Sequence, residues 1–508
     1  MRTIVVGAGS AGSVIASRLT EDGRHDVVLI EAGPDYPGAA ETPEVLPGPL
    51  RDGRQNSLHS HDWGYDYRAT AHRFWSALPM GFPRGRVVGG SSAVNTCIAL
   101  RGMPYDYDEW ASLGLPEWSW SQCLPAFKRL ETDLDFDNEW HGRTGPIPIR
   151  RHPPSELVPW QAAFVEACVE LGFPRSADTN DPTTTGVGPH AMNKIDGQRI
   201  SAARAYLGAA VRARPNLRIS AETIVRRVLL RDGRVQGIEI ERHGRVHDLL
   251  ADRVVLCAGA IATPGILLRS GIGPAADVAR LGVELVSDVP GVGSRLLDHP
   301  GVAIFFLPLH AEMASVEHPL IQTVCRYAST GGMGPNDMQL QPGSFIPLPR
   351  FPLAGVTIAA VVGKSRARGR IRFPSARPAD APTLHTNLLG DEKDRAAVRE
   401  ALRWISKLAR TKAVSALARP IYPSRRPFDE AGELRGPLEQ ITGSGYHPCG
   451  TVPMGKDDDP GAATDGRGRV RGVEGLVVAD ASLMPTIPSS NTNVPSLMIG
   501  ERFGEWLR

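Results

Sequence analysis

The chain has 508 residues, of which 42% are hydrophobic and 22% charged, as is ordinary for a globular protein. Its length predicts about three domains rather than one small core. The 57 basic and 55 acidic residues leave a net charge of +2, so we expect no nucleic-acid partner. No apolar run approaches the roughly 18 residues of a membrane span, and the first predicted strand leaves no room for a secretory leader. We therefore expect a cytoplasmic protein without a membrane span.

Cysteine and histidine spacing gives no sign of a metal site. His59 and His61 lie two residues apart and could share one face of a strand, but no third ligand is near them in the sequence. The cysteines show no CxxC spacing, which argues against both a zinc site and a disulfide framework. They are Cys97, Cys123, Cys168, Cys257, Cys325 and Cys449.

The first 31 residues have the order of a dinucleotide-binding unit. An apolar run at Thr3–Val6 predicts a buried strand, and Gly7–Gly12 follows it with the pattern GxGxxG. Ser13–Thr20 then predicts a helix, and Val27–Ile30 predicts a second strand that leads into Glu31. Strand, glycine turn, helix, strand and acid is the context in which this fingerprint indicates a nucleotide site.

Each residue of the fingerprint has a physical reason. Gly7 permits the tight turn, Gly9 lets the backbone approach a pyrophosphate, and Gly12 lets the helix lie close to the strand. The pyrophosphate would bind the free N–H groups at the helix N-terminus. Glu31, 19 residues after Gly12, is placed to accept hydrogen bonds from a ribose. The fingerprint alone does not decide which dinucleotide binds.

Three further stretches indicate ligand-facing backbone. Residues 85–95 carry adjacent glycines and serines between apolar flanks, typical either of a plain loop or of backbone against a flat ligand. Arg253–Ala258 predicts a strand that opens onto a helix at Gly259, and Val289–Gly293 precedes Asp298-His299. Leu476–Asp480 predicts another buried strand. We interpret His299 as structural.

These patterns predict an α/β protein, α+β overall, with two domains. The first is a Rossmann-like dinucleotide-binding domain with a parallel sheet, over residues 1–152, 187–305 and 436–508. The second is a substrate-binding cap with an antiparallel sheet and helices, over 153–186 and 306–435. Periodicity predicts helices at 118–131, 160–171, 391–409 and 494–507, and strands within 216–241 (joined by the turn Asp232-Gly233), 356–362 and 370–373.

Five segments together resemble the glucose–methanol–choline (GMC) oxidoreductase family. They are Gly85–Asp108, Gly259–Gly273, Pro290–His299, Tyr446–Thr451 and Asn491–Asn493. The resemblance covers nearly the whole chain and is thinnest over 150–190 and 300–380. It implies that the dinucleotide is FAD. Some members attach the flavin through a histidine where this chain has Val94, so we expect non-covalent FAD.

The resemblance also assigns residues to the cofactor. Val225 is expected to offer backbone groups to the adenine, while Ser92, Asn95 and Thr96 are expected along the flavin. The full expected set is Gly7, Gly9, Ser10, Ala11, Gly12, Glu31, Ala32, Arg86, Val88, Gly90, Ser91, Ser92, Asn95, Thr96, Val225, Ala258, Gly259, Asp480, Ala481, Asn491, Asn493 and Val494.

The expected chemistry is oxidation of a primary alcohol to an aldehyde, with hydride transfer to flavin N5. His447 is the expected base, because histidine titrates near neutral pH. Asn491 occupies the family's second active-site position, and its amide is expected to hydrogen-bond the substrate oxygen. The small-molecule alcohol is one partner, and O2 (giving H2O2) or another electron acceptor is the second.

Several alternatives remain open at this point. The family includes dehydrogenases for choline and other alcohols that use a non-oxygen acceptor, and hydroxynitrile lyases whose FAD does no redox work. A flavin-binding protein without activity would require the His447 and Asn491 pair to be a coincidence. We favour a ring-bearing alcohol of the pyridoxine type; choline would need an aromatic or acidic cage that the sequence does not reveal. The chain could be a monomer or a dimer.

Overall fold

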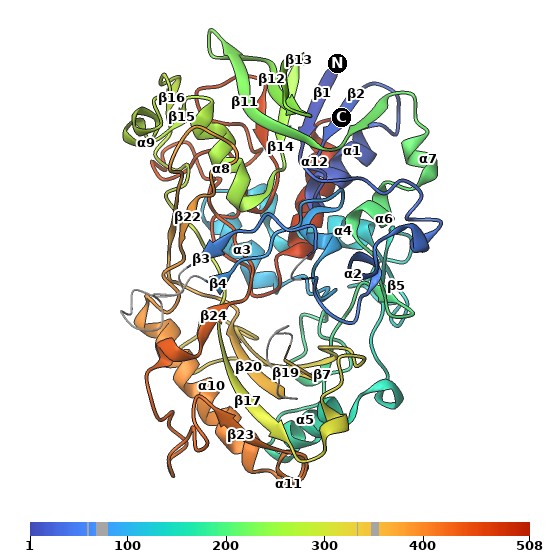
Figure 1. The fold of residues 1–508 in the computed structure, drawn as a ribbon, viewed down its shortest axis with the longest axis vertical. Coiled ribbons are helices and arrows are strands. Elements are labelled where there is room, and N and C mark those ends of the chain that lie inside the picture. The colour runs from blue at the N-terminus through green and yellow to red at the C-terminus, as the bar shows by residue number, and fades with distance from the viewer. Residues whose placement is uncertain (58–59, 68–79, 333, 347–354) are drawn as a thin grey trace.

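The computed structural model describes residues 1–57, 60–67, 80–332, 334–346 and 355–508 (Figure 1). A parallel sheet lies in the upper part of Figure 1 and an antiparallel sheet in the lower part. Both termini lie in the upper part.

The parallel sheet has five strands, in the order β10-β2-β1-β14-β25. Val5 in the central strand pairs with Leu29 on one side and Val255 on the other. All four predicted apolar runs are strands of this sheet, which confirms the Rossmann-like prediction. The bounds are β10 (Leu217–Ser220), β2 (Asp26–Ile30), β1 (Arg2–Val6), β14 (Arg253–Leu256) and β25 (Leu476–Val478).

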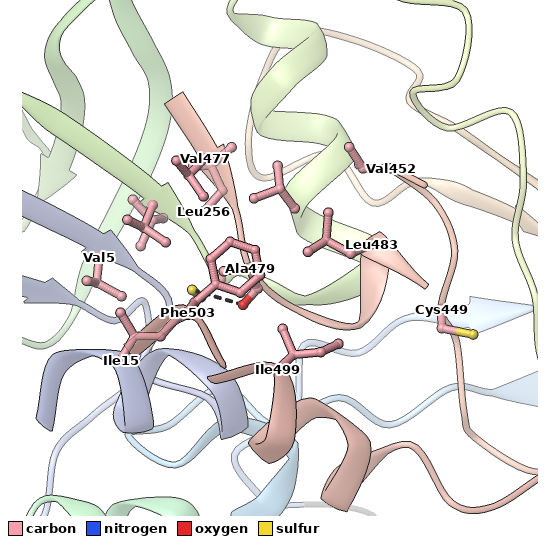
Figure 2. Close-up of a cluster of buried hydrophobic side chains, with 14 of the residues drawn as sticks. Val5, Ile15, Leu256, Cys449, Val452, Val477, Ala479, Leu483, Ile499 and Phe503 are labelled. Atoms are coloured by element: carbon pink, nitrogen blue, oxygen red, sulfur yellow. Dashed lines mark hydrogen bonds between the residues drawn. The ribbon is translucent and has the colours of Figure 1, made fainter. Parts of the chain in front are cut away.

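The first and last helices pack together against this sheet. α1 (Ser10–Leu19) and α12 (Asn493–Trp506) approach closely because α12 presents glycine to α1: a Cβ at Gly500 would lie 2.8 Å from that of Val14. Figure 2 shows Ile15 of α1 and Phe503 of α12 in one buried cluster with side chains of the parallel strands. The N-termini of both helices therefore reach the same edge of the sheet.

A three-stranded antiparallel ribbon packs beside this layer. It consists of β11 (Thr223–Arg231), β12 (Arg234–Arg242) and β13 (Arg245–Leu250). The predicted turn Asp232-Gly233 joins the first two strands, and its residues have φ of 51° and 72°. Two successive positive φ values are what a tight two-residue hairpin turn requires.

The antiparallel sheet has seven strands, in the order β23-β17-β20-β19-β18-β7, with β24 also paired to β17. One of its faces packs against α5 (Pro159–Glu170) and α10 (Glu392–Arg410), which confirms both predicted helices. The strands are β23 (Ala418–Tyr422), β17 (Pro300–Pro308), β20 (Val356–Val362), β19 (Met338–Gly343), β18 (Thr323–Tyr327), β7 (Gly186–Pro189) and β24 (Thr442–Ser444).

Three stretches of this sheet fall on the other side of the sequence-based boundaries. β7 from residue 187 onward, the first part of β17 and β24 lie within 187–305 and 436–508, which were assigned to the dinucleotide-binding domain. These short strands carry glycine and no clear alternation, so their sheet partners are not evident from the sequence. We propose that these strands belong to the substrate-binding domain.

The other elements connect these layers. α4 (Trp120–Leu130) starts after Trp118 because Pro116–Trp118 forms a separate 3₁₀ turn. The remaining elements are α2 (Gly48–Arg51), α3 (Pro104–Ser112), α6 (Ala202–Tyr206), α7 (Ala209–Arg212), α8 (Gly259–Arg269), α9 (Ala275–Arg280), α11 (Lys412–Ser415), β3 (Asp66–Tyr67), β4 (Met80–Gly81), β5 (Glu131–Asp133), β6 (Ile147–Ile149), β8 (Lys194–Ile195), β9 (Gln198–Arg199), β15 (Ile272–Gly273), β16 (Ser287–Asp288), β21 (Arg370–Arg372) and β22 (Thr383–His385).

All six cysteines are buried free thiols. Of the helices in the described ranges, none is long and apolar enough to cross a membrane. His59 of the histidine pair lies outside the described residues, and His61 hydrogen-bonds the hydroxyl group of Tyr36 at 2.7 Å.

A buried ion network surrounds His141. Its Nδ1 lies 2.9 Å from Asp133 and 3.0 Å from Glu131, and its Nε2 lies 2.7 Å from Asp178. Arg151 pairs with the carboxylates of Asp133 and Asp178. Because its guanidinium group already neutralises these acids, we interpret the cluster as an ion network rather than a metal site. Burial lowers the pKa of His141, but its hydrogen bonds to the three carboxylates outweigh this cost and raise the pKa to about 10.

Replacing His141 by glutamine is expected to destabilise the fold by about 3–5 kcal/mol near pH 6, because buried acids lose a cation. The raised pKa means that this contribution is complete below 6.5, the ordinary histidine pKa, and is lost as the pH rises toward about 10. The difference in thermal unfolding midpoint between wild type and variant should therefore narrow by more than half between pH 6 and pH 9.5. An equal difference at both pH values would contradict a protonated His141.

Candidate active site

A cavity of about 850 Å³ lies between the parallel and antiparallel sheets. Its upper wall is formed where β1, β2, β14 and β25 end, which is the edge at which open α/β sheets bind ligands. The N-terminal turns of α1, α8 and α12 reach the same wall. Three helix N-termini direct N–H groups and partial positive charge toward an anionic ligand.

The glycine fingerprint has the predicted geometry. Gly7 has a φ of 99°, and a Cβ there would lie 2.5 Å from the carbonyl oxygen of Cys257. A Cβ at Gly12 would lie 1.9 Å from the carbonyl oxygen of Gly7, so only glycine lets α1 rest on the turn. Gly90 belongs to the second glycine stretch and packs against the first. A Cβ added at Gly90 would lie 2.7 Å from the Cα of Gly9. Both Gly9 and Gly90 line the cavity, so two backbone segments without side chains face the ligand-binding cavity side by side.

Glu31 closes one end of this wall. Its carboxylate accepts the N–H of Ala8 at 3.1 Å and that of Gly33 at 2.9 Å. Burial raises its pKa to about 7. Because a carboxylate has about four acceptor positions, two hydrogen bonds leave room for a ribose hydroxyl.

Most of the expected cofactor residues line the cavity. These are Gly7, Gly9, Ser10, Ala11, Glu31, Ala32, Arg86, Gly90, Ser91, Asn95, Thr96, Val225, Ala258, Gly259, Asp480, Ala481, Asn491 and Asn493. Gly12, Val88, Ser92 and Val494 do not line it; in the structure they support the wall, and their contact with the cofactor stays a prediction.

The four supporting residues have identifiable packing roles. Gly12 carries the contact of α1 with the turn, while Val88 and Val494 are buried in the core of the upper part. The Ser92 hydroxyl group donates to Gly89 at 2.6 Å and accepts the N–H of Ala202 at 2.9 Å, so it is directed inward.

Two polar residues connect the strand and helix ends. Asp480 accepts the N–H of Gly259 at 2.8 Å and the hydroxyl group of Thr263 at 2.7 Å, which fixes the start of α8. Ser10 of α1 donates to the Asn493 side-chain oxygen at 2.8 Å. The Asn493 amide nitrogen is buried and has no hydrogen-bond partner among the residues described. This unused donor at the cavity wall fits the polar edge of a bound cofactor.

The two expected catalytic residues lie side by side. Asn491 Nδ2 is 2.9 Å from His447 Nε2, and both residues line the cavity. Tyr446, directly before His447, has a φ of 63°, a left-handed conformation that is costly for a non-glycine residue. Asp298 holds the turn from the other side, since its carboxylate accepts the N–H of His447 at 2.9 Å.

His299 determines which nitrogen of His447 is free. His299 Nε2 is 3.0 Å from the carbonyl oxygen of Pro488, which can only accept, so this nitrogen carries the proton. Burial lowers the pKa of His299 to about 4, so the ring is neutral and its Nδ1 is an acceptor. That Nδ1 is 2.9 Å from His447 Nδ1, which must therefore be the donor. His447 Nε2 is left unprotonated at the cavity, as a general base requires.

Burial and the nearby His299 and Arg84 lower the pKa of His447 well below its ordinary value of 6.5. A base with a lowered pKa stays unprotonated to lower pH, and activity is lost only as the pH falls through that lowered value. We therefore expect kcat/KM for an uncharged alcohol to stay constant from pH 8 to pH 6. A profile that loses half its value near pH 6.5–7 would contradict this environment.

Sequence reasoning missed part of this site. His299 was interpreted as structural, yet it contacts His447 directly. Gln339 and Gln341, which also line the cavity, were not singled out. The available signals were the Asp298-His299 pair after a glycine turn, and the alternation of polar and apolar residues in Met338–Gln341.

The chain matches the GMC oxidoreductase family over residues 1–301 and again over 365–500. It is 34% identical to the 5-(hydroxymethyl)furfural oxidase of Methylovorus sp. strain MP688, over 99% of this chain and 97% of that protein. It is 33% identical to an oxygen-dependent choline dehydrogenase of Brucella anthropi, over 98% of this chain and 94% of that protein. The crystal structure of pyridoxine 4-oxidase from Mesorbium loti superposes with a TM-score of 0.90 at 29% identity, over 99% and 98% of the two chains.

The chain therefore belongs to the GMC oxidoreductase family. It is an enzyme that acts on CH–OH donors, and FAD is its cofactor. The paired glycine stretches, three helix N-termini and free Asn493 donor are the features of the chain that fit this cofactor.

Proposed function

We propose that the protein oxidises a primary alcohol to an aldehyde, with His447 as the base and O2 as the electron acceptor. The observation that carries the proposal is the unprotonated Nε2 of His447 at the cavity, fixed through His299 and Pro488. When bound, FAD supplies the hydride acceptor for the substrate carbon.

The proposed roles follow from the contacts of the two side chains. His447 Nε2 accepts the proton of the substrate hydroxyl group. Asn491 now donates to that same nitrogen, and its amide would instead donate to the substrate oxygen as negative charge develops there. The Asn491 side-chain oxygen has no hydrogen-bond partner among the described residues. Because no hydrogen bond holds this oxygen, the amide can reorient.

A ring-bearing hydroxymethyl compound of the pyridoxine type is the substrate class we favour. The relatives named for 5-(hydroxymethyl)furfural and pyridoxine support this class. Choline is the alternative, supported by the choline dehydrogenase relatives. Within the described part of the antiparallel sheet, no carboxylate lines the cavity, so that wall offers no acidic partner to a quaternary ammonium.

We also propose that FAD is held without a covalent bond. Val94 lines the cavity at the position of the family's attachment histidine, and an aliphatic side chain cannot form that bond. Acid precipitation of the purified protein should then release yellow cofactor into the supernatant.

Product analysis in air tests the proposed reaction. Purified holoenzyme is incubated with benzyl alcohol, 5-(hydroxymethyl)furfural, pyridoxine and choline, and aldehyde and H2O2 are both quantified. Equal amounts of both products from a ring-bearing alcohol support the proposal. If aldehyde forms only when an artificial electron acceptor is added, the natural acceptor is not O2. If choline is the one compound oxidised, the proposed substrate class is wrong and choline takes its place.

A further inference from the structure

One face of the antiparallel sheet forms the cavity wall opposite the parallel strands. Val302, Ile304 and Phe306 of β17 point into the core with α5 and α10, whereas Ala303 and Phe305 line the cavity. The same alternation holds in β20. The described side chains of β17, β19 and β20 that face the cavity are uncharged, and Gln339 and Gln341 are the amides among them.

A chain of hydrogen bonds fixes the direction of both amides. Gln339 Nε2 lies 3.2 Å from the carbonyl oxygen of Ser489, which can only accept, so the Gln339 amide nitrogen must face it. The Gln339 oxygen therefore faces Gln341, whose Nε2 donates to it at 2.7 Å. This leaves the oxygen of Gln341 as an acceptor, and no hydrogen bond from the described residues occupies it.

Strand pairing places these amides on the same sheet as the strand that leads to His447, three strands away from it. Gln339 pairs with Val361, which pairs with Gly301, which in turn pairs with Gly443 in the strand that leads to His447. The Ser489 carbonyl oxygen that orients Gln339 is two residues from Asn491. The amide chain thus contacts the segment that carries Asn491.

The neighbours of Gln341 leave space for a flat group. Gln341 pairs with Ala359, and Ala359 pairs with Ala303, so the row across the sheet carries two small side chains. Phe305 lies in the next row of β17 and also lines the cavity. A half-buried acceptor beside a shallow apolar floor suits an aromatic ring that carries a polar substituent.

The charge near this row disfavours a cation. Arg326 pairs with Gln339, is buried, and donates to the carbonyl oxygens of Thr179 at 2.8 Å and Ser489 at 3.3 Å. No ion pair of Arg326 occurs within the described residues. The carboxylates of Asp106 and Asp178 act on this guanidinium group without pairing with it directly, so its charge is only partly balanced. The remaining positive charge disfavours a quaternary ammonium more than a neutral substrate.

We propose that Gln341 determines specificity by accepting a hydrogen bond from a second hydroxyl group on an uncharged aromatic alcohol, oriented by the chain Ser489–Gln339–Gln341. This inference rests on the proposed alcohol oxidation and names its substrate class. The substrate's reacting hydroxymethyl group faces His447, and its second hydroxyl group meets the Gln341 oxygen.

The test compares the ortho, meta and para isomers of benzenedimethanol with the corresponding methylbenzyl alcohols, which lack only the second hydroxyl oxygen. In the wild-type holoenzyme, kcat/KM for the best diol should exceed that of its methyl partner about 10-fold or more, since the bound methyl compound covers the half-buried acceptor and leaves it unpaired. In Gln341→Leu the ratio should fall to about 1, with the methyl compound still oxidised. Each ratio compares two substrates of the same protein preparation. Partial loss of folded enzyme lowers both kcat/KM values equally and does not alter the ratio.

Two further variants make the result specific. Gln339→Leu should also lower the ratio, because Gln341 loses the acceptor that orients it. Thr357→Val changes another polar side chain of the cavity wall and should keep the wild-type ratio. A wild-type ratio near 1 for all three isomers, or a high ratio that persists in Gln341→Leu, would overturn the inference and leave alcohol oxidation standing. Failure to oxidise either series would overturn the proposed function itself.

Discussion

Replacing His447 by glutamine is expected to lower kcat/KM for alcohol oxidation by about 10²- to 10⁴-fold, the range attributed to a positioned general base. Glutamine can still hydrogen-bond but cannot take a proton at pH 7. The backbone N–H of residue 447 would keep its bond to Asp298, so the turn is expected to fold as before. The variant should therefore retain FAD and its yellow colour.

The decisive measurement is the rate at which alcohol reduces the flavin in a stopped-flow instrument without oxygen. His247→Gln is the matched control, because His247 is an exposed histidine on β13, away from the cavity lining. The control should react at the wild-type rate. A His447→Gln rate within tenfold of wild type would assign the base to another group.

The second large effect is expected from Gly9→Ala. A Cβ at Gly9 would lie 3.9 Å from the Cα of Gly90, an ordinary contact, so the protein is expected to fold. The added methyl group would, however, occupy the backbone surface that we expect to approach the pyrophosphate. We expect FAD to bind about 10- to 100-fold more weakly, the equivalent of about 1–3 kcal/mol of overpacking.

Titration of the apoprotein with FAD, followed by quenching of flavin fluorescence, measures this loss. Gly48→Ala is the matched control, because a Cβ at Gly48 would have no neighbour within 4 Å. Unchanged affinity in Gly9→Ala would mean that the two glycine stretches do not face the pyrophosphate.

Local sequence patterns predicted much of the fold. The fingerprint Gly7–Gly12 has a local cause, since a tight turn and a close helix contact demand glycine at fixed spacing, and the structure confirms both contacts. The hairpin at Asp232-Gly233 is equally local. The helix at 391–409 was evident because its apolar face repeats with the helical period, and it is α10 in the structure.

The missed parts depend on contacts between distant segments. β7, β18 and β24 are short, and nothing in their sequences shows that they join one sheet with β17. His299 looked structural because its partner, His447, lies 148 residues further along the chain. Ser92 and Val494 were expected at the cofactor through their position in family segments; their side chains turn into the protein, and their contact with the cofactor stays a prediction.

Gln339 and Gln341 show the same limit at the substrate site. Their alternation with Met338 and Leu340 indicates a strand, but not which face meets the ligand. Only the sheet register and the bond to Ser489 reveal that the amides face the cavity in a fixed direction. Specificity therefore could not be deduced from the residue types alone.

The most direct test of the account is a visible spectrum of the purified holoenzyme, recorded without oxygen before and after a ring-bearing primary alcohol is added. We predict that the flavin colour bleaches, that the corresponding aldehyde forms in equal amount, and that air restores the colour. A protein that stays yellow with every primary alcohol while it cleaves a cyanohydrin would contradict the account, and it would make the chain a lyase with non-redox FAD.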